Sequence, residues 1–425
     1  MQHSIPPGVF DISPYETKEQ WRATHWWTYV ERVFRNLAAI YGFQEIRTPI
    51  FERTELFQRS VGETSDIVSK EMYTFIDKGE RSMSLRPEGT APIMRSVVEN
   101  HLEQVAPILK FSYIGPMFRY ERSQAGRYRQ HHQFGAEVVG SSAPEQEAEL
   151  IDLLHTLCST LGLKNLHVNI NSIGDTECRQ TYRTALQNYF RAHVQKLSKD
   201  SQIRLDTNPL RILDSKDPQD KEITAGAPCI LDFLSDACKA HFEKVQKRLQ
   251  ELKIPFSINP LLVRGLDYYN RTVFEIVAGE LGAQNSVCGG GRYDGLLKTL
   301  GGPNLPAIGF GLGIERLIQT MIKQGVPPPP QYAPKLFLIA LGDAAKDAAF
   351  LLLHDLRQKG VLAQMDFEDR KLNKQMQQAN QIHAEYIVVL GDDELKSGKI
   401  ELKKMSTGEK SAISLVDLPK ILQET

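Results

Sequence analysis

Apolar residues recur at two different spacings along the chain, and each spacing predicts a different element. Near the N-terminus a set of large apolar residues lies three or four positions apart: Trp26, Val30, Val33, Phe34 and Leu37. This spacing is that of one helix face. Ser13, Pro14 and Glu16 stand where a capping box places its serine, its first helical residue and its third. We therefore expect a long helix that starts just after Ser13.

Short strand-like runs follow this helix, and glycine and proline separate them. They are EIRTPIF at 45–51, MYTFID at 72–77 and ILKFSYIGPMFRYE at 108–121. Consecutive strands joined by short links are typical of an antiparallel sheet.

The rest of the chain changes pattern twice. Residues 174–258 have a polar helical pattern and lack the glycine-rich and arginine-centred segments on either side, so we expect a helical insertion. Four consecutive prolines at 327–330 favour a stiff spacer. Beyond them strands alternate with helices, which predicts a parallel or mixed sheet. The expected domains are a catalytic domain at 1–173 and 259–325, the insertion at 174–258, a linker at 326–334 and a C-terminal domain at 335–425.

Composition narrows the functional classes. The chain has 425 residues, 41% of them hydrophobic, and a net charge of −1. It contains no apolar run long enough to cross a membrane and no signal-peptide pattern near its start, so we expect a cytoplasmic protein without membrane contact. The five cysteines form no C-x-x-C pair, and the histidines form no H-E-x-x-H pattern. We therefore expect neither a disulfide framework nor a protein-bound metal.

The segment from Tyr113 to Gly140 carries the densest set of candidate functional side chains. Arg119 and Glu121 alternate with apolar neighbours, which places them on one face of a predicted strand. A basic, glycine-containing loop follows, and Gln133, Gly135 and Glu137 then share one face of the returning strand. A solvent-exposed hairpin with alternating charges would show the same pattern.

Four further segments combine glycine with charged residues. Glu88 and Thr90 flank Gly89 before a predicted helix, and Arg264 precedes a tyrosine pair beside a predicted strand. The other two are VCGGGRYDGLL at 287–297 and GFGLGIERLI at 309–318. Three consecutive glycines allow the backbone to approach a ligand closely. Each segment alone is equally compatible with an ordinary turn.

Together these segments resemble the class II aminoacyl-tRNA synthetases, and specifically the histidyl-tRNA synthetase family, over nearly the whole chain. The segment at 45–66 resembles motif 1, with Pro49 at a dimer interface. The hairpin from Arg119 to Glu137 resembles motif 2, and GFGLGIERL resembles motif 3. The segments VRGLDYYNRTVFE at 263–275 and GGGRYDGL at 289–296 resemble the two signatures particular to the histidine enzyme.

The resemblance implies an α+β fold: an antiparallel six-stranded sheet flanked by helices, with a helical insertion and a C-terminal α/β anticodon-binding domain. It implies a homodimer that joins L-histidine to histidine tRNA through a histidyl-adenylate. ATP would bring Mg²⁺ with it. Neither step needs an enzyme nucleophile, so catalysis would depend on positioning and charge stabilisation. This agrees with candidate residues that are mostly arginines and glycines.

The resemblance also assigns roles to single residues. The expected catalytic residues are Arg119 and Arg264. The expected histidine-binding residues are Glu88, Gly89, Thr90, Arg119, Gln133, Glu137, Arg264, Tyr268, Tyr269 and Tyr293. The expected ATP-binding residues are Arg119, Glu121, Arg127, His131 and Arg316, and the expected tRNA contact is Gln124. His131 stands where the family commonly has a phenylalanine that stacks on adenine, with Phe134 as the alternative ring.

Two other functions share parts of this pattern. The synthetase-like regulatory subunit of ATP phosphoribosyltransferase has the same catalytic-domain fold and no ligase activity. It lacks an anticodon-binding domain and has eroded signature segments, whereas this chain has both signatures and about ninety residues after the prolines. A non-catalytic scaffold would not need the phosphate-facing arginines.

Overall fold

The computed structural model describes residues 4–15, 18–62, 65–121, 127–215, 217–279, 286–331, 333–368 and 370–424. The chain divides into two compact units, Met1–Pro329 and Pro330–Thr425. In the described residues, no helix is long and apolar enough to cross a membrane.

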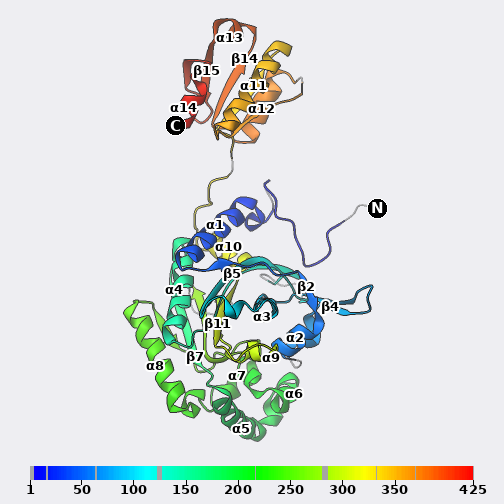
Figure 1. The fold of residues 1–425 in the computed structure, drawn as a ribbon, viewed down its shortest axis with the longest axis vertical. Coiled ribbons are helices and arrows are strands. Elements are labelled where there is room, and N and C mark those ends of the chain that lie inside the picture. The colour runs from blue at the N-terminus through cyan, green and yellow to red at the C-terminus, as the bar shows by residue number, and fades with distance from the viewer. Residues whose placement is uncertain are drawn as a thin grey trace. The chain divides into compact units, whose positions relative to one another are not determined.

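An eight-stranded sheet forms the centre of the first unit (Figure 1). In spatial order its strands are β1 (Gln44–Glu45), β5 (Leu109–Phe118), β6 (Gln130–Val139), β11 (Ala307–Gly313), β10 (Ser286–Arg292), β9 (Asn270–Ala278), β7 (Leu166–Ser172) and β8 (Phe256–Ile258). The six strands from β5 to β7 are antiparallel, as expected. A short parallel strand extends the sheet at each edge.

Helices cover the two faces of this sheet unequally. Four of them pack on one face over a large apolar core: α1 (Thr24–Ile40), α4 (Pro144–Thr160), α8 (Asp236–Glu251) and α10 (Ile314–Lys323). The other face carries α3 (Thr90–Glu99) and the short α9 (Leu296–Thr299) over a smaller core. Part of that second face therefore stays accessible to ligands.

The prediction for the N-terminal helix was wrong about its start. Helix α1 begins at Thr24, after a 3-10 turn η1 (Gln20–Arg22), and its N-cap Ala23 makes no side-chain cap. Ser13 instead pairs through its backbone with Arg22 and Thr24. The backbone of Ser13 therefore forms a bridge to residues 22–24 in the folded chain, and Ser13 does not cap a helix. The predicted apolar face is confirmed, because Trp26, Val30 and Phe34 are buried in the core.

The run at 45–51 does not form one strand. It is divided between β1 and β2 (Phe51–Arg53), and β2 belongs to a separate three-stranded sheet with β4 (Ser82–Leu85) and β3 (Thr74–Ile76). Pro49 lies between the two pieces and has no N–H to donate to a strand partner. Helix α2 (Thr54–Val61), a π-helical turn η2 (Ile67–Glu71) and a 3-10 turn η3 (Leu102–Gln104) complete this region.

The insertion is helical, as predicted, and has its own core. Its elements are α5 (Thr176–Ala192), η4 (Val194–Lys196), α6 (Lys199–Thr207), η5 (Pro209–Ile212), α7 (Pro218–Thr224) and η6 (Ile230–Phe233) (Figure 1, green). Tyr182, Leu186 and Phe190 of α5 pack inside it. Helix α8 differs, because Phe242, Val245 and Leu249 pack into the main core of the first unit.

The second unit is a five-stranded mixed sheet with helices packed on it. Its elements are β12 (Leu336–Ala340), α11 (Asp343–Gln358), β13 (Ala363–Met365), α12 (Leu372–Gln381), β14 (Tyr386–Leu390), α13 (Asp392–Ser397), β15 (Lys399–Lys404), β16 (Lys410–Ser414) and α14 (Leu418–Glu424). Strands β12, β13 and β14 pair in parallel, and the hairpin of β15 and β16 adds antiparallel strands. The predicted alternation of strands with helices and the mixed sheet are therefore confirmed.

Candidate active site

A polar cleft of about 370 Å³ lies on the more open face of the large sheet. Glycines of the central strands form part of its lining, including Gly289 of β10 and Gly311 of β11. Because a glycine has no side chain, the backbone itself is accessible to a ligand at these positions. Arginines supply most of the charge in the cleft: Arg119, Arg127, Arg264 and Arg316. Of the carboxylates in the described residues, Glu121 and Glu315 lie among them. The cleft therefore suits an anionic ligand.

Arg119 and Glu121 lie beyond the end of β5, which stops at Phe118. The prediction that they share one face of that strand was therefore wrong, although both residues line the cleft. The Arg119 backbone N–H still donates to the Arg129 carbonyl at 2.9 Å. Its side-chain Nε donates to the Pro87 carbonyl at 2.8 Å. That bond fixes the stem of the guanidinium, and among the described residues its terminal nitrogens bond no other side chain, so they can contact a ligand.

The Arg264 guanidinium occupies the space above Gly289. A Cβ at Gly289 would collide with the terminal atoms of Arg264, so only glycine permits this arrangement. The nearest described carboxylate is that of Glu275, whose Oε2 lies 3.9 Å from Nη1. The Arg264 Nε is buried and has no hydrogen-bond partner among the described residues. Much of the hydrogen-bonding capacity of this cation is therefore available to a ligand.

Arg316 and Arg127 lie at the other end of the cleft. Arg316 is in the first turn of α10, as predicted, and its Nη1 donates to the Ser286 carbonyl at 3.0 Å. Burial and the neighbouring Arg127 lower the pKa of Arg316. Arg127 pairs with Glu121 at 3.4 Å. Two like charges held this close favour a polyanion between them.

His131 and His132 point to opposite faces of β6. His131 lines the cleft, and burial together with Arg119 lowers its pKa to about 3, so its ring is neutral. His132 bonds the Glu315 carboxylate through Nδ1 at 2.9 Å and contacts Trp27 and Phe10. Phe134 is fully buried and stacks on Phe34 at 4.5 Å between ring centroids. Phe134 therefore cannot replace His131 as a ring facing the cleft.

Glu137 lies at the centre of a buried group of polar side chains. The Thr90 hydroxyl donates to its Oε1 at 2.7 Å, and the Tyr293 hydroxyl donates to its Oε2. Burial raises the pKa of Glu137 to about 8, although both hydrogen bonds act in the opposite direction. The nearby Glu88 adds to the rise. The pocket thus stabilises a protonated carboxyl group near neutral pH.

Glu88 closes the N-terminal end of α3. Its two carboxylate oxygens accept the backbone N–H groups of Thr90 at 2.7 Å and Ala91 at 2.8 Å. Burial raises its pKa, since the carboxylate is taken out of water. Each oxygen retains a second lone pair, so the carboxylate can still accept a bond from a ligand cation.

Three tyrosines pack together beside Glu137. The ring centroids of Tyr268 and Tyr269 are 4.7 Å apart, and those of Tyr268 and Tyr293 are 5.4 Å apart. Burial raises the pKa of Tyr269 to about 12, so its hydroxyl remains protonated and can donate. The two segments predicted to be specific for histidine, 263–275 and 289–296, therefore meet in this pocket.

The sequence prediction missed one residue of this pocket, Tyr113. Its ring lies where a Cβ at Gly89 or at Gly135 would be, so those two glycines make room for it. Its pKa is raised well above the usual value by burial and by the charges of Glu137 and Glu88. The available signal was its place at the start of the segment 113–140, on the same face of the hairpin as Gly135.

Two predicted site residues require separate comment. Gln133 lies on β6 and lines the cleft, as its alternation with Gly135 predicted. Gln124 lies outside the described residues.

In the described part of the chain, one group of side chains could hold a metal ion: Asp175, Cys178 and Cys238. None of them lines the cleft. Asp175 caps α5, and the Cys238 thiol donates to Asp175 Oδ2 at 3.3 Å. These bonds satisfy the group without a metal, and the expectation of no protein-bound metal stays a prediction.

Family models match both units of the chain. A model described as histidyl-tRNA synthetase matches residues 18–317, and one described as an anticodon binding domain matches residues 335–425. A histidine–tRNA ligase of Protochlamydia amoebophila is 63% identical over 423 residues, which cover all of both chains. A histidine–tRNA ligase of Geobacillus sp. is 48% identical over 428 residues, which cover 100% of this chain and 99% of that one.

Solved structures show the same likeness. The apo histidyl-tRNA synthetase of S. aureus is 39% identical and has a TM-score of 0.83, covering 99% of this chain and 100% of its own. A protein of Bacillus halodurans, named an ATP phosphoribosyltransferase regulatory subunit/histidyl-tRNA synthetase, has a TM-score of 0.63 at 22% identity, covering 89% of this chain and 97% of its own. That second likeness concerns the fold alone.

Proposed function

Because the chain belongs to the histidyl-tRNA synthetase family, we propose which of its residues bind the substrates of that family's reaction and which stabilise the reacting groups. The chain is an enzyme, a class II aminoacyl-tRNA synthetase that ligates histidine to its tRNA with ATP and Mg²⁺ as co-substrates. The observation that carries the assignment of roles is that the arginine-lined cleft and the buried group around Glu137 lie on the same face of β6, where Gln133 lines the cleft and Glu137 accepts from Thr90. A regulatory subunit without ligase activity is not favoured, because ligases match the full length of the chain.

The reaction has two steps. An oxygen of the histidine carboxylate attacks the α-phosphorus of ATP, and the bond to pyrophosphate breaks. A ribose hydroxyl at the end of the tRNA then attacks the acyl carbon and AMP leaves, while the hydroxyl proton passes to solvent or to the leaving phosphate. Both steps develop negative charge on oxygen, so positioned cations and donors lower the barrier.

We propose that Arg119 and Arg264 contact the reacting groups. Arg119 has free terminal nitrogens beside the cleft, which suits a bidentate contact with the α-phosphate and the histidine carboxylate. Arg264 lies over the bare backbone at Gly289, where its charge can stabilise the phosphorus centre without a protein-bound metal. Arg127 and Arg316 would hold the far phosphates, and Glu121 would meet the Mg²⁺ that the substrate brings. His131 would lie against the adenine.

The pocket around Glu137 suits a neutral imidazole, which has one N–H donor and one bare nitrogen. We propose that Glu137 accepts from the N–H and that the Tyr269 hydroxyl donates to the bare nitrogen. Tyr268 and Tyr293 would complete the walls. Amino acids without this donor and acceptor pattern would leave buried polar groups unpaired, a cost that can reach roughly 10⁴-fold in discrimination.

The α-amino group of histidine needs acceptors at the mouth of the pocket. We propose that Glu88, Thr90 and Gln133 supply them, beside the backbone of Gly89. Glu88 is the charged member of the set. Its two oxygens already accept two amides of α3, and the second lone pair on each oxygen can accept from the amino group.

Other parts of the chain are proposed to handle the tRNA. Residues 335–425 match an anticodon-binding model and would read the anticodon, with the prolines of 326–334 as linker. Residues 335–425 contain 13 lysines and arginines against 14 aspartates and glutamates, so a local basic patch rather than overall charge would bind RNA. Gln124 is the proposed contact to the acceptor end, and the cytoplasm, where translation uses charged tRNA, is the proposed location.

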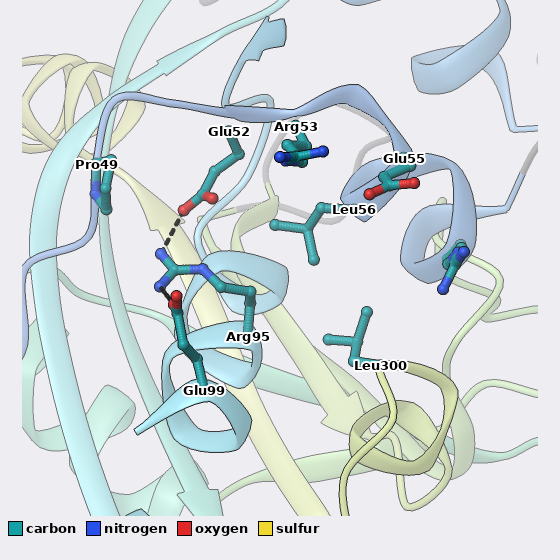
Figure 2. A pocket seen from close by; sticks show the side chains of 9 residues that line it. Pro49, Glu52, Arg53, Glu55, Leu56, Arg95, Glu99 and Leu300 are labelled. Carbon is teal, nitrogen blue, oxygen red and sulfur yellow. Dashed lines mark hydrogen bonds and ion pairs between the residues drawn. The ribbon is translucent and has the colours of Figure 1, made fainter. Parts of the chain in front are cut away.

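We propose a homodimer through the segment around Pro49. Figure 2 shows Pro49, Glu52 and Arg53 beside a pocket in which Arg95 pairs with Glu52 at 2.5 Å and with Glu99 at 2.7 Å. Two exposed phenylalanines share one face of the neighbouring small sheet, Phe51 of β2 and Phe75 of β3, with ring centroids 6.2 Å apart. Such a cluster on one sheet is typical of a surface that another chain covers.

Sedimentation equilibrium tests the dimer. A Phe51→Glu, Phe75→Glu double variant should sediment as a single 48.0 kDa chain, whereas the unchanged protein should sediment at twice that mass. Phe350→Glu is the control, because Phe350 is an equally exposed phenylalanine of α11 in the second unit. A double variant that stays dimeric would place the interface elsewhere.

Pyrophosphate exchange into ATP tests the first step and its specificity. The exchange should depend on histidine and should not occur with the other standard amino acids. Equal exchange with a second amino acid would contradict the proposed pocket around Glu137.

A further inference from the structure

Residues 263–269 carry three of the proposed active-site side chains, yet they form neither a helix nor a strand. The segment contains Arg264, Tyr268 and Tyr269, and it lies between β8 and β9. Without a regular ladder of backbone bonds, its conformation depends on side chains that come from elsewhere. Small displacements here would move the Arg264 guanidinium away from Gly289.

The helical insertion supplies three of those side chains. Arg179 of α5 donates from Nη1 to the Tyr269 carbonyl at 2.8 Å. Asn208, which follows α6, donates to the Asp267 carboxylate at 3.0 Å. Arg211 of η5 reaches the Arg264 carbonyl at 3.4 Å. The three donors thus form hydrogen bonds near both ends of the segment and in its middle. Only about 30 Å³ of free space lies among them.

Two of the donors are fixed by further contacts, Arg179 through the cap of its own helix and Arg211 through Asp66 outside the insertion. Asp175 caps α5 by accepting the Cys178 N–H at 3.0 Å, one residue before Arg179. Arg211 is held from its other side by Asp66, whose Oδ2 is 3.7 Å from Nη2. Each donor side chain is therefore attached to ordered backbone, in α5, in η5 or between α6 and η5.

The sheet and α2 hold the same segment from other directions. Asn171 of β7 donates to the Leu262 carbonyl at 3.0 Å, just before the segment begins. The Asp267 backbone N–H donates to the Val61 carbonyl at 3.3 Å, at the end of α2. The sheet and α2 thus fix its first end and its middle, whereas the insertion is what bonds the carbonyls of Arg264 and Tyr269.

We propose that Arg179, Asn208 and Arg211 are positioning residues for histidine activation, so that the insertion forms part of the machinery of the first step. They touch no substrate and act through Arg264 and Tyr269. The inference rests on the roles proposed above for those two residues. A shift of about 1 Å in a charged group beside the reacting atoms can cost up to about 10²-fold in rate. Loss of one of three donors should cost less, about tenfold.

Steady-state pyrophosphate exchange of the full chain tests the proposal. Arg179→Met and Asn208→Ala should each lower kcat about tenfold and raise KM for histidine a few-fold. KM for ATP should change less than about twofold, since the γ-phosphate end is held by Arg127 and Arg316.

Two controls separate positioning from general loosening of the insertion. Arg191→Met removes a guanidinium of the same helix that pairs with Asp206 at 3.0 Å within the insertion, and it should leave kcat unchanged. Tyr182→Phe removes a buried hydroxyl that donates to the Pro228 carbonyl at 2.9 Å, so it should lower Tm without touching the segment. An equal loss of kcat in Tyr182→Phe would overturn the proposal.

A double-mutant cycle with Arg264→Ala gives the decisive comparison. If Arg179 acts through Arg264, Arg179→Met should lower kcat by less than about threefold when Arg264 is already alanine. A full further tenfold loss would show that Arg179 acts independently and would overturn the inference. Unchanged protein that shows no histidine-dependent exchange would instead contradict the proposed function itself.

Discussion

Glu137 links the pocket to the pH dependence of stability. It keeps its proton up to about pH 8 in the folded protein, whereas the usual value for a glutamate is 4.5. Between these two pH values the folded chain holds one more proton at this site than the unfolded chain does. The contribution of Glu137 to stability therefore falls as pH rises through this window.

Glu137→Gln should remove that dependence, because glutamine does not titrate. Urea denaturation at about pH 5 and about pH 8 would measure it. The unchanged protein should lose more stability between the two conditions than the variant does. Equal losses would mean that Glu137 ionises normally in the folded chain.

Arg264 should act mainly on turnover. Arg264→Ala removes a cation that lies over bare backbone at Gly289. Loss of one charge-stabilising group typically costs about 10²-fold or more in kcat. Histidine-dependent pyrophosphate exchange would show this, with smaller changes in KM for either substrate. A raised KM with normal kcat would make Arg264 a ground-state binding residue.

The sequence pattern predicted the residues that β6 contributes to the pocket better than the tyrosines that pack against them. The alternation of Gln133, Gly135 and Glu137 on β6 was predictable, because a strand repeats every two residues. The bond from Tyr293 to Glu137 was not, since it joins residues 156 positions apart. The pairing of Tyr113 with Gly135 in one hairpin was the available signal, but the second glycine that makes room for its ring, Gly89, comes from another segment.

At the level of elements, β11 shows how one strand shapes the pocket. A Cβ at Gly309 would occupy the position of the Glu137 carboxylate, whereas a Cβ at Gly313 would meet no atom within 4 Å. Gly309→Ala should therefore displace Glu137 and raise KM for histidine at least about tenfold. Gly313→Ala on the same strand should behave like the unchanged protein. Isothermal titration with histidine would compare them, and equal affinities would contradict the packing at Gly309.

The elements differ in how far local pattern determines them. The apolar face of α1 and the alternation of strands and helices in the second unit followed from periodicity, because the spacing of apolar residues alone determines which of them share a face. The start of α1 did not, since Ser13 is used in a bridge to Arg22 and Thr24. Likewise, the division of 45–51 between two sheets depends on strands contributed by later parts of the chain.

On the scale of the whole molecule, composition located the division into units. The prolines at 327–330 span the boundary between Pro329 and Pro330. The order of strands in the large sheet was beyond prediction from pattern alone, because β5 and β6 pair next to β11 while residues 140–306 intervene. The family resemblance implied an antiparallel six-stranded sheet but not the order of its strands.

The two units have separate apolar cores, and this has a calorimetric consequence. Among the described residues, none of the second unit belongs to the clusters around α1 or α3, so each unit should melt as its own cooperative transition. All three tryptophans, Trp21, Trp26 and Trp27, lie in the first core, so tryptophan fluorescence should follow only one of the two heat-absorption peaks.

Ligands should then move the peaks separately. Histidine with ATP at about 100 times Kd should stabilise one transition by about 2.7 kcal/mol, and an anticodon stem-loop should stabilise the other. A single peak shifted by both ligands would mean that the chain unfolds as one thermodynamic unit. With two independent peaks, one scan would show whether a substitution weakens the part that activates the amino acid or the part that reads the RNA.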